Sequence, residues 1–262
     1  MYIFQKKWAQ KIFSLVAFCL CAIGILSYTY NHYASPLITS SKVGDRHLPV
    51  YCVDCGDEKK IALTFDAAWG NEDTGQILEI LDKHNIKVTF FMTGGWAEHF
   101  PDDVKMIHAA GHDLGNHSEN HKNMSQLSSA QIKDELMQVH EKVKQLTGYD
   151  MFLFRPPYGD YDNEVITTAS ECGYYSIQWD VDSLDWKDYG VDSIINTVTK
   201  HKHLGNGSII LCHNGAKYTA EALDTMISAL KENGYTFVPV SELIYKENYH
   251  MNHEGRQIPD VR

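Results

Sequence analysis

The chain has 262 residues, of which 44% are hydrophobic and 22% are charged, a composition that argues against intrinsic disorder. That length accommodates one large α/β domain once an N-terminal segment is set aside. The formal net charge of -11 argues against nucleic acid as a partner, because an acidic domain repels phosphate backbones, and it makes a neutral or cationic substrate easier to accommodate.

The N-terminal segment is an uncharged apolar run at residues 12–28, IFSLVAFCLCAIGILSY, preceded by Lys6, Lys7 and Lys11. It can be a cleaved signal peptide or an uncleaved anchor, whereas a buried helix of a soluble core fits less well because the run is apolar on all faces. No small-x-small cleavage site directly follows it, so we favour a transmembrane helix within residues 1–28. The lysines place the amino end in the cytoplasm. We therefore expect a single-pass protein of the cell membrane with an extracytoplasmic domain, or a secreted protein if the segment is cleaved.

A polar stem follows at residues 29–58 and is expected to be a linker, because it contains prolines, glycines and serines. Cys52 and Cys55 form CVDC within it and can be either a small disulfide or free thiols in a surface loop. The folded domain is expected over residues 59–245. The polar segment at 246–262 is expected to be a loose tail.

Apolar strands and amphipathic helices alternate along the domain. Strands are expected at 60–65, 87–92, 112–116, 151–155, 174–180, 207–212 and 235–239, and helices at 71–84, 97–110, 128–147, 161–172, 191–203 and 217–233. In the third helix, Ile132, Leu136 and Val139 form part of a helical stripe, and Ser128 is a plausible N-cap. Such alternation predicts an α/β fold with a mostly parallel sheet, curled into a (β/α)7-type barrel.

Polar side chains follow several of these strands directly. They are Asp66, His117 with His121, Arg155, Asp185 with Trp186, and His213. In barrels and open α/β sheets, functional groups gather at the carboxyl ends of successive strands. The sequence therefore predicts one site that contains all of them.

A histidine pair four residues apart suits a single divalent metal, since imidazole is a preferred ligand of zinc and related ions. His117 and His121 can also be surface histidines, because the chain has 14 histidines and chance pairs are expected. Asp66 can cap the next helix or act as a site carboxylate. Asn71 and Asp73 are better placed for capping, which favours a role for Asp66 in taking a proton from metal-bound water.

The turn after the fourth expected strand is stiffened by two prolines in RPPYG. Its remaining backbone N–H groups then point in fixed directions, which suits an oxyanion hole. Arg155 can hold Asp66 ionised, or it can be a structural arginine paired with another acid.

A second proton-transfer unit is indicated by Asp185 and His213. An aspartate that is hydrogen-bonded to a histidine fixes the tautomer of the ring and favours the imidazolium, which makes it a general acid. Trp186 and Leu211 can form the wall of a small apolar pocket. The alternative is that Trp186 belongs to the core and His213 is a buried histidine with satisfied hydrogen bonds.

With these residues in place, the chain resembles the polysaccharide deacetylase superfamily, the NodB homology domain of carbohydrate esterase family four, over about residues 58 to 243. The resemblance rests on five motifs in order: TFDAAWG (64–70), HSENH (117–121), RPPYG (155–159), DSLDW (182–186) and LCH (211–213). FDAAWG and VDSLDWK are most similar to the sporulation and peptidoglycan branch. The resemblance implies a distorted (β/α) barrel that removes N-acetyl groups from the amino sugars of a cell-wall polysaccharide.

The resemblance also implies a role for each matching residue. Asp66 would be the general base, tuned by Arg155. His117 and His121 would bind the divalent metal, usually zinc, with cobalt or manganese as alternatives.

The remaining roles follow from the third, fourth and fifth motifs. The Tyr158 backbone N–H would contribute to the oxyanion hole. His213, set by Asp185, would protonate the leaving amine. Trp186 and Leu211 would hold the acetyl methyl group.

One position departs from the family pattern. The second aspartate of the first motif, which is the third metal ligand in the family, is replaced here by Ala67. Water could fill the gap, Asp66 could move onto the metal, or Asp73 or another carboxylate could reach in. This departure leaves open a weak or inactive glycan-binding protein. An O-acetyl esterase acting on xylan or a similar polymer also stays open, because the same residues would serve an ester, which leaves more easily than an amide.

Overall fold

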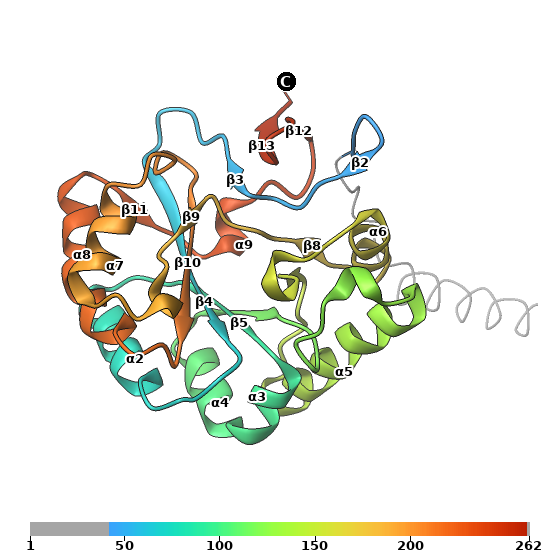
Figure 1. Ribbon diagram of the computed structural model, residues 1–262, viewed down its shortest axis with the longest axis horizontal. Helices are drawn as coiled ribbons and strands as arrows, with labels where there is room; N and C mark the ends of the chain where they lie inside the picture. The colour runs from blue at the N-terminus through green and yellow to red at the C-terminus, as the bar shows by residue number, and fades with distance from the viewer. Residues whose placement is uncertain (1–41, 261–262) are drawn as a thin grey trace, which may run out of the picture. The chain divides into compact units, whose positions relative to one another are not determined.

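The computed structural model of the chain describes residues 42–260 (Figure 1). All the described residues belong to one compact unit. The expected transmembrane helix at residues 1–28 lies outside the described residues. Within 42–260, no helix is both long enough and apolar enough to cross a membrane.

A parallel sheet forms the centre of the domain (Figure 1). Its strands run in the order β8 (Tyr175–Ser176), β7 (Leu153–Phe154), β6 (Asp113–Asn116), β5 (Thr89–Met92), β4 (Lys60–Ala67), β10 (Ile209–Asn214) and β9 (Val181–Asp182), while β11 (Thr236–Phe237) pairs with the start of β4. Every pairing in this sheet is parallel. Among the described strands no ladder joins β8 to β9. The fold is therefore an α/β half-barrel that is open on one side, which confirms the expected parallel α/β sheet and corrects the expected (β/α)7-type barrel to a half-barrel.

Helices cover the outer face of the sheet (Figure 1). They are α2 (Thr74–Lys83), α3 (Gly94–His99), α4 (Pro101–Ala109), α5 (Ser129–Thr147), α6 (Asn163–Glu171), α7 (Val191–Thr199) and α8 (Thr219–Glu232). The short α9 (Val240–Leu243) packs instead in the core on the opposite face of the sheet, through Val240 and Leu243. Ser128 begins α5 with the expected cap, as part of a capping box with Gln131. The helix expected at 97–110 is two helices, because the backbone leaves the helical region at Phe100 and Pro101 starts α4.

The side chains of β4 alternate between two hydrophobic cores on opposite faces of the sheet. Phe65 and Ala67 belong to the larger core beneath the helices, whereas Ala62 belongs to the inner core. Because strand side chains alternate, Thr64 and Asp66 share the inner face with Ala62. The strand thus brings a buried carboxylate to the inside of the half-barrel at its carboxyl end.

A second, small sheet contributes Val53 and Met251 to the inner core. It consists of β3 (Cys52–Val53), β13 (Arg256–Pro259) and β12 (Tyr249–Met251). The final segment thus contributes two strands and is not a loose tail. A loose tail was predicted because the segment is polar and shows no local strand pattern. Its strands form because β13 pairs with β3, which lies about 200 residues earlier in the chain.

The stem before the domain also takes part in the fold. The strands β1 (Lys42–Val43) and β2 (Arg46–His47) form a small hairpin. Val50 then bridges to Ile177, and Cys52 bridges to Ser208, so this segment runs across the opening between β8 and β9. Residues 42–53 are therefore structured, contrary to the expected linker, and Cys52 and Cys55 are free thiols.

Candidate active site

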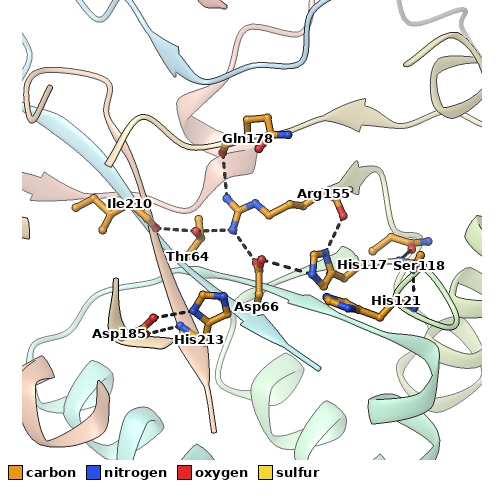
Figure 2. A network of polar contacts seen from close by, with 11 residues as sticks. Thr64, Asp66, His117, Ser118, His121, Arg155, Gln178, Asp185, Ile210 and His213 are labelled. Carbon is orange, nitrogen blue, oxygen red and sulfur yellow. Dashed lines mark hydrogen bonds and ion pairs between the residues drawn. The ribbon is translucent and has the colours of Figure 1, made fainter. Parts of the chain in front are cut away.

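The predicted site residues converge at the carboxyl ends of the parallel strands, around one cavity of about 450 Å³. The cavity is lined by Asp66, Ala68, Trp69, His117, His121, Tyr158, Trp179, Asp182, Trp186, Leu211 and His213. Figure 2 shows Asp66 between the histidine pair on one side and the Asp185–His213 pair on the other. Arg155 and Asp185 contact this set from behind the cavity wall.

Asp66 is a buried carboxylate at the end of β4. Arg155 Nη1 lies 2.7 Å from Asp66 Oδ1 and also donates to Thr64 Oγ1, while Nη2 donates to the Gln178 carbonyl (Figure 2). Burial alone would raise the pKa of Asp66, but the charge and hydrogen bond of Arg155, together with His117 and His213, lower it below its ordinary value. Asp66 is therefore ionised at neutral pH, as a general base must be.

His117 follows β6 and is oriented by a backbone contact. Its Nδ1 donates to the Arg155 carbonyl at 2.7 Å, which leaves Nε2 facing Asp66 Oδ2 at 3.5 Å. Burial lowers the pKa of His117 to about 4, so the ring is neutral at pH 7. A neutral imidazole whose second nitrogen is held by a carbonyl is the form that binds metals.

His121 comes to the same place through a strained turn. The backbone adopts positive φ at Ser118 (65°) and at His121 (52°), and the His121 N–H donates to Ser118 Oγ at 3.1 Å. The rings of His117 and His121 lie 4.9 Å apart between centroids. Burial also lowers the pKa of His121. The two imidazoles converge from a tight loop, which is one of the two geometries expected from their spacing.

These donors fit a metal ion only in part. Ala67 presents its side chain to the helix-side core and offers no ligand. Asp73 does not line the cavity, because its Oδ1 accepts a hydrogen bond from the Gly215 N–H. Within residues 42–260, no group of three or more His, Cys, Asp or Glu side chains is arranged to hold one ion. A metal would thus have two imidazole ligands, with Asp66 the nearest carboxylate.

The second proton-transfer pair is fully formed. His213 Nδ1 donates to Asp185 Oδ1 at 2.7 Å, and the His213 backbone N–H donates to Oδ2, which also accepts from Thr219 Oγ1. Burial disfavours the imidazolium, but the hydrogen bond and charge of Asp185, with Asp66 and Asp182, raise the pKa of His213 above its ordinary value. This arrangement keeps His213 protonated to higher pH, as a general acid requires.

Aromatic side chains surround the mouth of the cavity. Tyr158 has φ of 60° and ψ of 7°, and its ring lies 4.5 Å from that of His121. Trp186 is half exposed, so it is not a core residue, and Leu211 is a buried residue of the cavity wall. Both residues therefore line the cavity, and their role in holding a methyl group stays a prediction.

Four residues of the cavity wall were not predicted from the sequence, namely Ala68, Trp69, Trp179 and Asp182. Trp69 stacks on His213 with 4.9 Å between ring centroids and 27° between the planes. Trp69 could have been predicted as a site residue from its position in the TFDAAWG motif, since it comes only three residues after Asp66.

The fold and the cavity define an α/β half-barrel protein with an acid–base site at the carboxyl edge of its sheet. The chain belongs to the polysaccharide deacetylase family, whose profile matches residues 54–177. The peptidoglycan-N-acetylmuramic acid deacetylase PdaA of Bacillus subtilis is 36% identical over 198 residues, covering 72% of this chain and 73% of that protein. A peptidoglycan-N-acetylglucosamine deacetylase of Bacillus cereus is 36% identical over 194 residues, covering 71% and 69%.

Solved structures of the family share the fold. Bacillus subtilis PdaA, a family 4 carbohydrate esterase, matches with a TM-score of 0.69 at 32% identity, covering 83% of this chain and 88% of that one. BA3943 of Bacillus anthracis, described as a pseudoenzyme of the same family, matches with a TM-score of 0.69 at 35% identity, covering 79% and 70%. A BA3943 mutant described as having restored enzymatic activity is 40% identical, with a TM-score of 0.69 and coverage of 72% and 69%.

Proposed function

We propose that the chain is a hydrolase that removes N-acetyl groups from amino sugars of peptidoglycan. The observation that supports this most is the separation of two proton-transfer groups across one cavity. Asp66 has a lowered pKa and His213 has a raised one, so a base and an acid coexist at neutral pH. Relatives that are named peptidoglycan deacetylases support the choice of substrate.

In the proposed reaction, Asp66 accepts a proton from the attacking water while Arg155 keeps its carboxylate ionised. His213 donates a proton to the leaving sugar nitrogen, and Asp185 holds its ring in the correct tautomer. The Tyr158 N–H stabilises the developing oxyanion. The acetyl methyl group lies against the apolar wall.

That apolar wall consists of Trp186 and Leu211, which both line the cavity. A divalent ion, zinc in the first instance with cobalt or manganese as alternatives, would be held by His117 and His121. When bound, it would polarise the acetyl carbonyl and lower the pKa of water. With two protein ligands in place of three, we expect weaker metal binding than in a complete site.

The test is acetate release from N-acetylated peptidoglycan fragments, with and without added zinc or cobalt. We expect metal-stimulated release by the wild-type protein, and a loss of at least about 100-fold in Asp66→Asn and in His213→Ala. A robust rate that neither substitution changes would overturn the assigned chemistry. Measuring the metal content of the protein before and after His117→Ala tests the proposed ligand independently.

A second candidate is a glycan-binding protein with weak or no turnover. Ala67 in place of the third ligand favours it, as does the similarity to the BA3943 pseudoenzyme. It predicts saturable glycan binding without metal-dependent acetate release. The O-acetyl esterase alternative uses the same residues, and comparing acetate yield from acetylxylan and from peptidoglycan fragments separates the two.

We also propose that residues 12–28 anchor the domain to the outer side of the cell membrane, and that the protein serves in sporulation. The uncharged run that follows three lysines supports the membrane anchor. The FDAAWG sequence supports a role in sporulation, because it resembles the sporulation branch of the family. Cell fractionation tests the anchor: the protein should sediment with membranes, and deletion of residues 1–28 should release it.

A further inference from the structure

An exposed corner at the rim of the cavity combines two aromatic faces with a positive charge. It consists of Trp186, Lys187 and Tyr189, on and just after the short 3-10 helix η3 (Asp185–Lys187). Trp186 is 50% exposed and Tyr189 is 67% exposed, although both are large aromatic residues. The Lys187 ammonium lies 4.9 Å from the centroid of the Trp186 ring and 5.9 Å from that of Tyr189. We call these three residues the aromatic–lysine corner.

The corner is held rigidly against the proposed acid. Leu184 and Asp188, on either side of η3, both have φ of 55°, and the Lys187 and Asp188 N–H groups donate to the carbonyls of Leu184 and Asp185. Asp185 itself is fully buried and hydrogen-bonded to His213. A ligand group bound at the corner is therefore fixed relative to the atom that His213 would protonate.

The positive charge of Lys187 is available to a ligand. In the described part of the chain its side chain contacts the two rings and takes part in none of the ion pairs. The carboxylate of Asp182 accepts a hydrogen bond from the Leu184 N–H. Among the described residues, no ion pair joins Asp182 or Asp188 to Lys187, while the protein as a whole has a net charge of -11.

We propose that the aromatic–lysine corner is a subsite for a carboxylate-bearing sugar, adjacent to the sugar whose acetyl group enters the cavity. The proposal rests on the proposed function and names the substrate class more closely. Exposed indole and phenol faces suit the C–H faces of a sugar ring, and the ammonium suits a carboxylate. Neutral chitin-like chains have no such group, whereas muramic acid carries one on its lactyl substituent or on the attached peptide. The corner would therefore favour muramic acid-containing chains.

The test is direct binding of defined tetrasaccharides to the whole protein, measured by titration calorimetry with acetate followed in the same samples. Four ligands are compared: a chain of N-acetylglucosamine and N-acetylmuramic acid with free lactyl carboxylates, its methyl ester, the same chain carrying stem peptides, and neutral chitotetraose. We expect the free acid to bind about fivefold more tightly than its ester. Added salt should weaken binding of the acid more than binding of the ester. Preference for the peptide-bearing chain over the free acid would place the recognised carboxylate on the peptide.

The matched variants are Lys187→Met, Lys187→Arg and, as a control, Lys133→Met on the exposed face of α5. Lys187→Met should remove the preference for the acid over the ester, Lys187→Arg should retain it, and Lys133→Met should leave it unchanged. Equal affinity of the wild-type protein for acid and ester overturns the proposal, as does a preference that survives in Lys187→Met. Because binding is read separately from acetate, loss of turnover with an intact preference would count against the proposed function alone.

Discussion

Asp66 and Arg155 form a buried ion pair at the centre of the site, with 2.7 Å between Oδ1 and Nη1. They lie 89 residues apart in the chain, yet neither has a substantial exposed surface. The guanidinium also lies 4.1 Å from the centroid of the Phe91 ring. This one contact joins the first and third motifs, and it couples the stability of the half-barrel to the ionisation of the proposed base.

Removing Arg155 should therefore destabilise the fold strongly. In Arg155→Met the buried Asp66 charge loses its partner, and we expect the free energy of unfolding in urea to fall by about 3–5 kcal/mol. The double variant Asp66→Asn/Arg155→Met should recover part of this loss, because no charge is left unpaired. The exposed Lys144–Asp150 pair provides the control: Asp150→Asn should cost less than about 1 kcal/mol. Equal costs for the two sites would contradict the role assigned to burial.

The pH dependence of turnover should follow the Asp185–His213 pair. Activity needs Asp66 ionised and His213 protonated, so kcat/KM should fall on the alkaline side as pH passes the raised pKa of His213. Asp185→Asn removes the charge that raises this pKa, and the alkaline limb should move to lower pH by about one unit. Asp188→Asn, on the same turn, should leave the limb in place. If the alkaline limb of the kcat/KM profile does not move in Asp185→Asn, a group other than the Asp185–His213 pair determines its pKa.

The same pair should affect stability, and the sign follows from the direction of the shift. His213 binds its proton more tightly in the folded state than in the unfolded state, where its pKa is near 6.5. Its stabilising contribution is fully present below that value and is lost as pH rises through the folded pKa. Urea unfolding of wild type and His213→Gln across this range should show the difference in stability between them shrinking toward high pH.

Local sequence patterns predicted the elements that carry the site, because their signals are local. The α5 stripe of Ile132 and Leu136 is buried as expected, and the polar residues that follow apolar strands do meet. The open edge between β8 and β9 was not predictable in this way. The strands on either side, β8 and β9, have two residues each and carry no periodicity of their own, and the backbone beside them bridges to the distant residues Val50 and Cys52.

The orientation of Trp69 could not be predicted from the sequence for a similar reason. Its neighbour Gly70 accepts hydrogen bonds at its carbonyl from Trp96 Nε1 and Asn214 Nδ2, which come from two other parts of the chain. A Cβ on Gly215 would come within 3.0 Å of the same carbonyl oxygen. Tertiary contacts therefore place the indole over His213, and spacing in the sequence cannot reveal them.

Trp69 should accordingly act as a positioning residue for His213. Trp69→Ala removes the stacked ring, and we expect kcat/KM for peptidoglycan fragments to fall about two- to tenfold, with Trp69→Phe retaining most activity. Stability should change little, because about half of the side chain is already exposed. In a His213→Ala background the same substitution should have no further effect. A full additional loss there would mean that Trp69 acts directly on substrate.

The last prediction concerns the missing carboxylate at position 67. Ala67 is fully buried in the core beneath the helices, so Ala67→Asp without metal should lower the free energy of unfolding by about 1–3 kcal/mol. If the strand end can turn this side chain toward His117 and His121, zinc should recover that loss and raise the melting temperature in a concentration-dependent manner. Ala67→Asn, which has a similar size but no charge, should show the loss with much less recovery. Differential scanning calorimetry over a zinc series makes the comparison. A destabilised Ala67→Asp protein that zinc does not rescue would show that the carboxylate stays in the helix-side core, and that more than one substitution separates this site from a three-ligand metal centre.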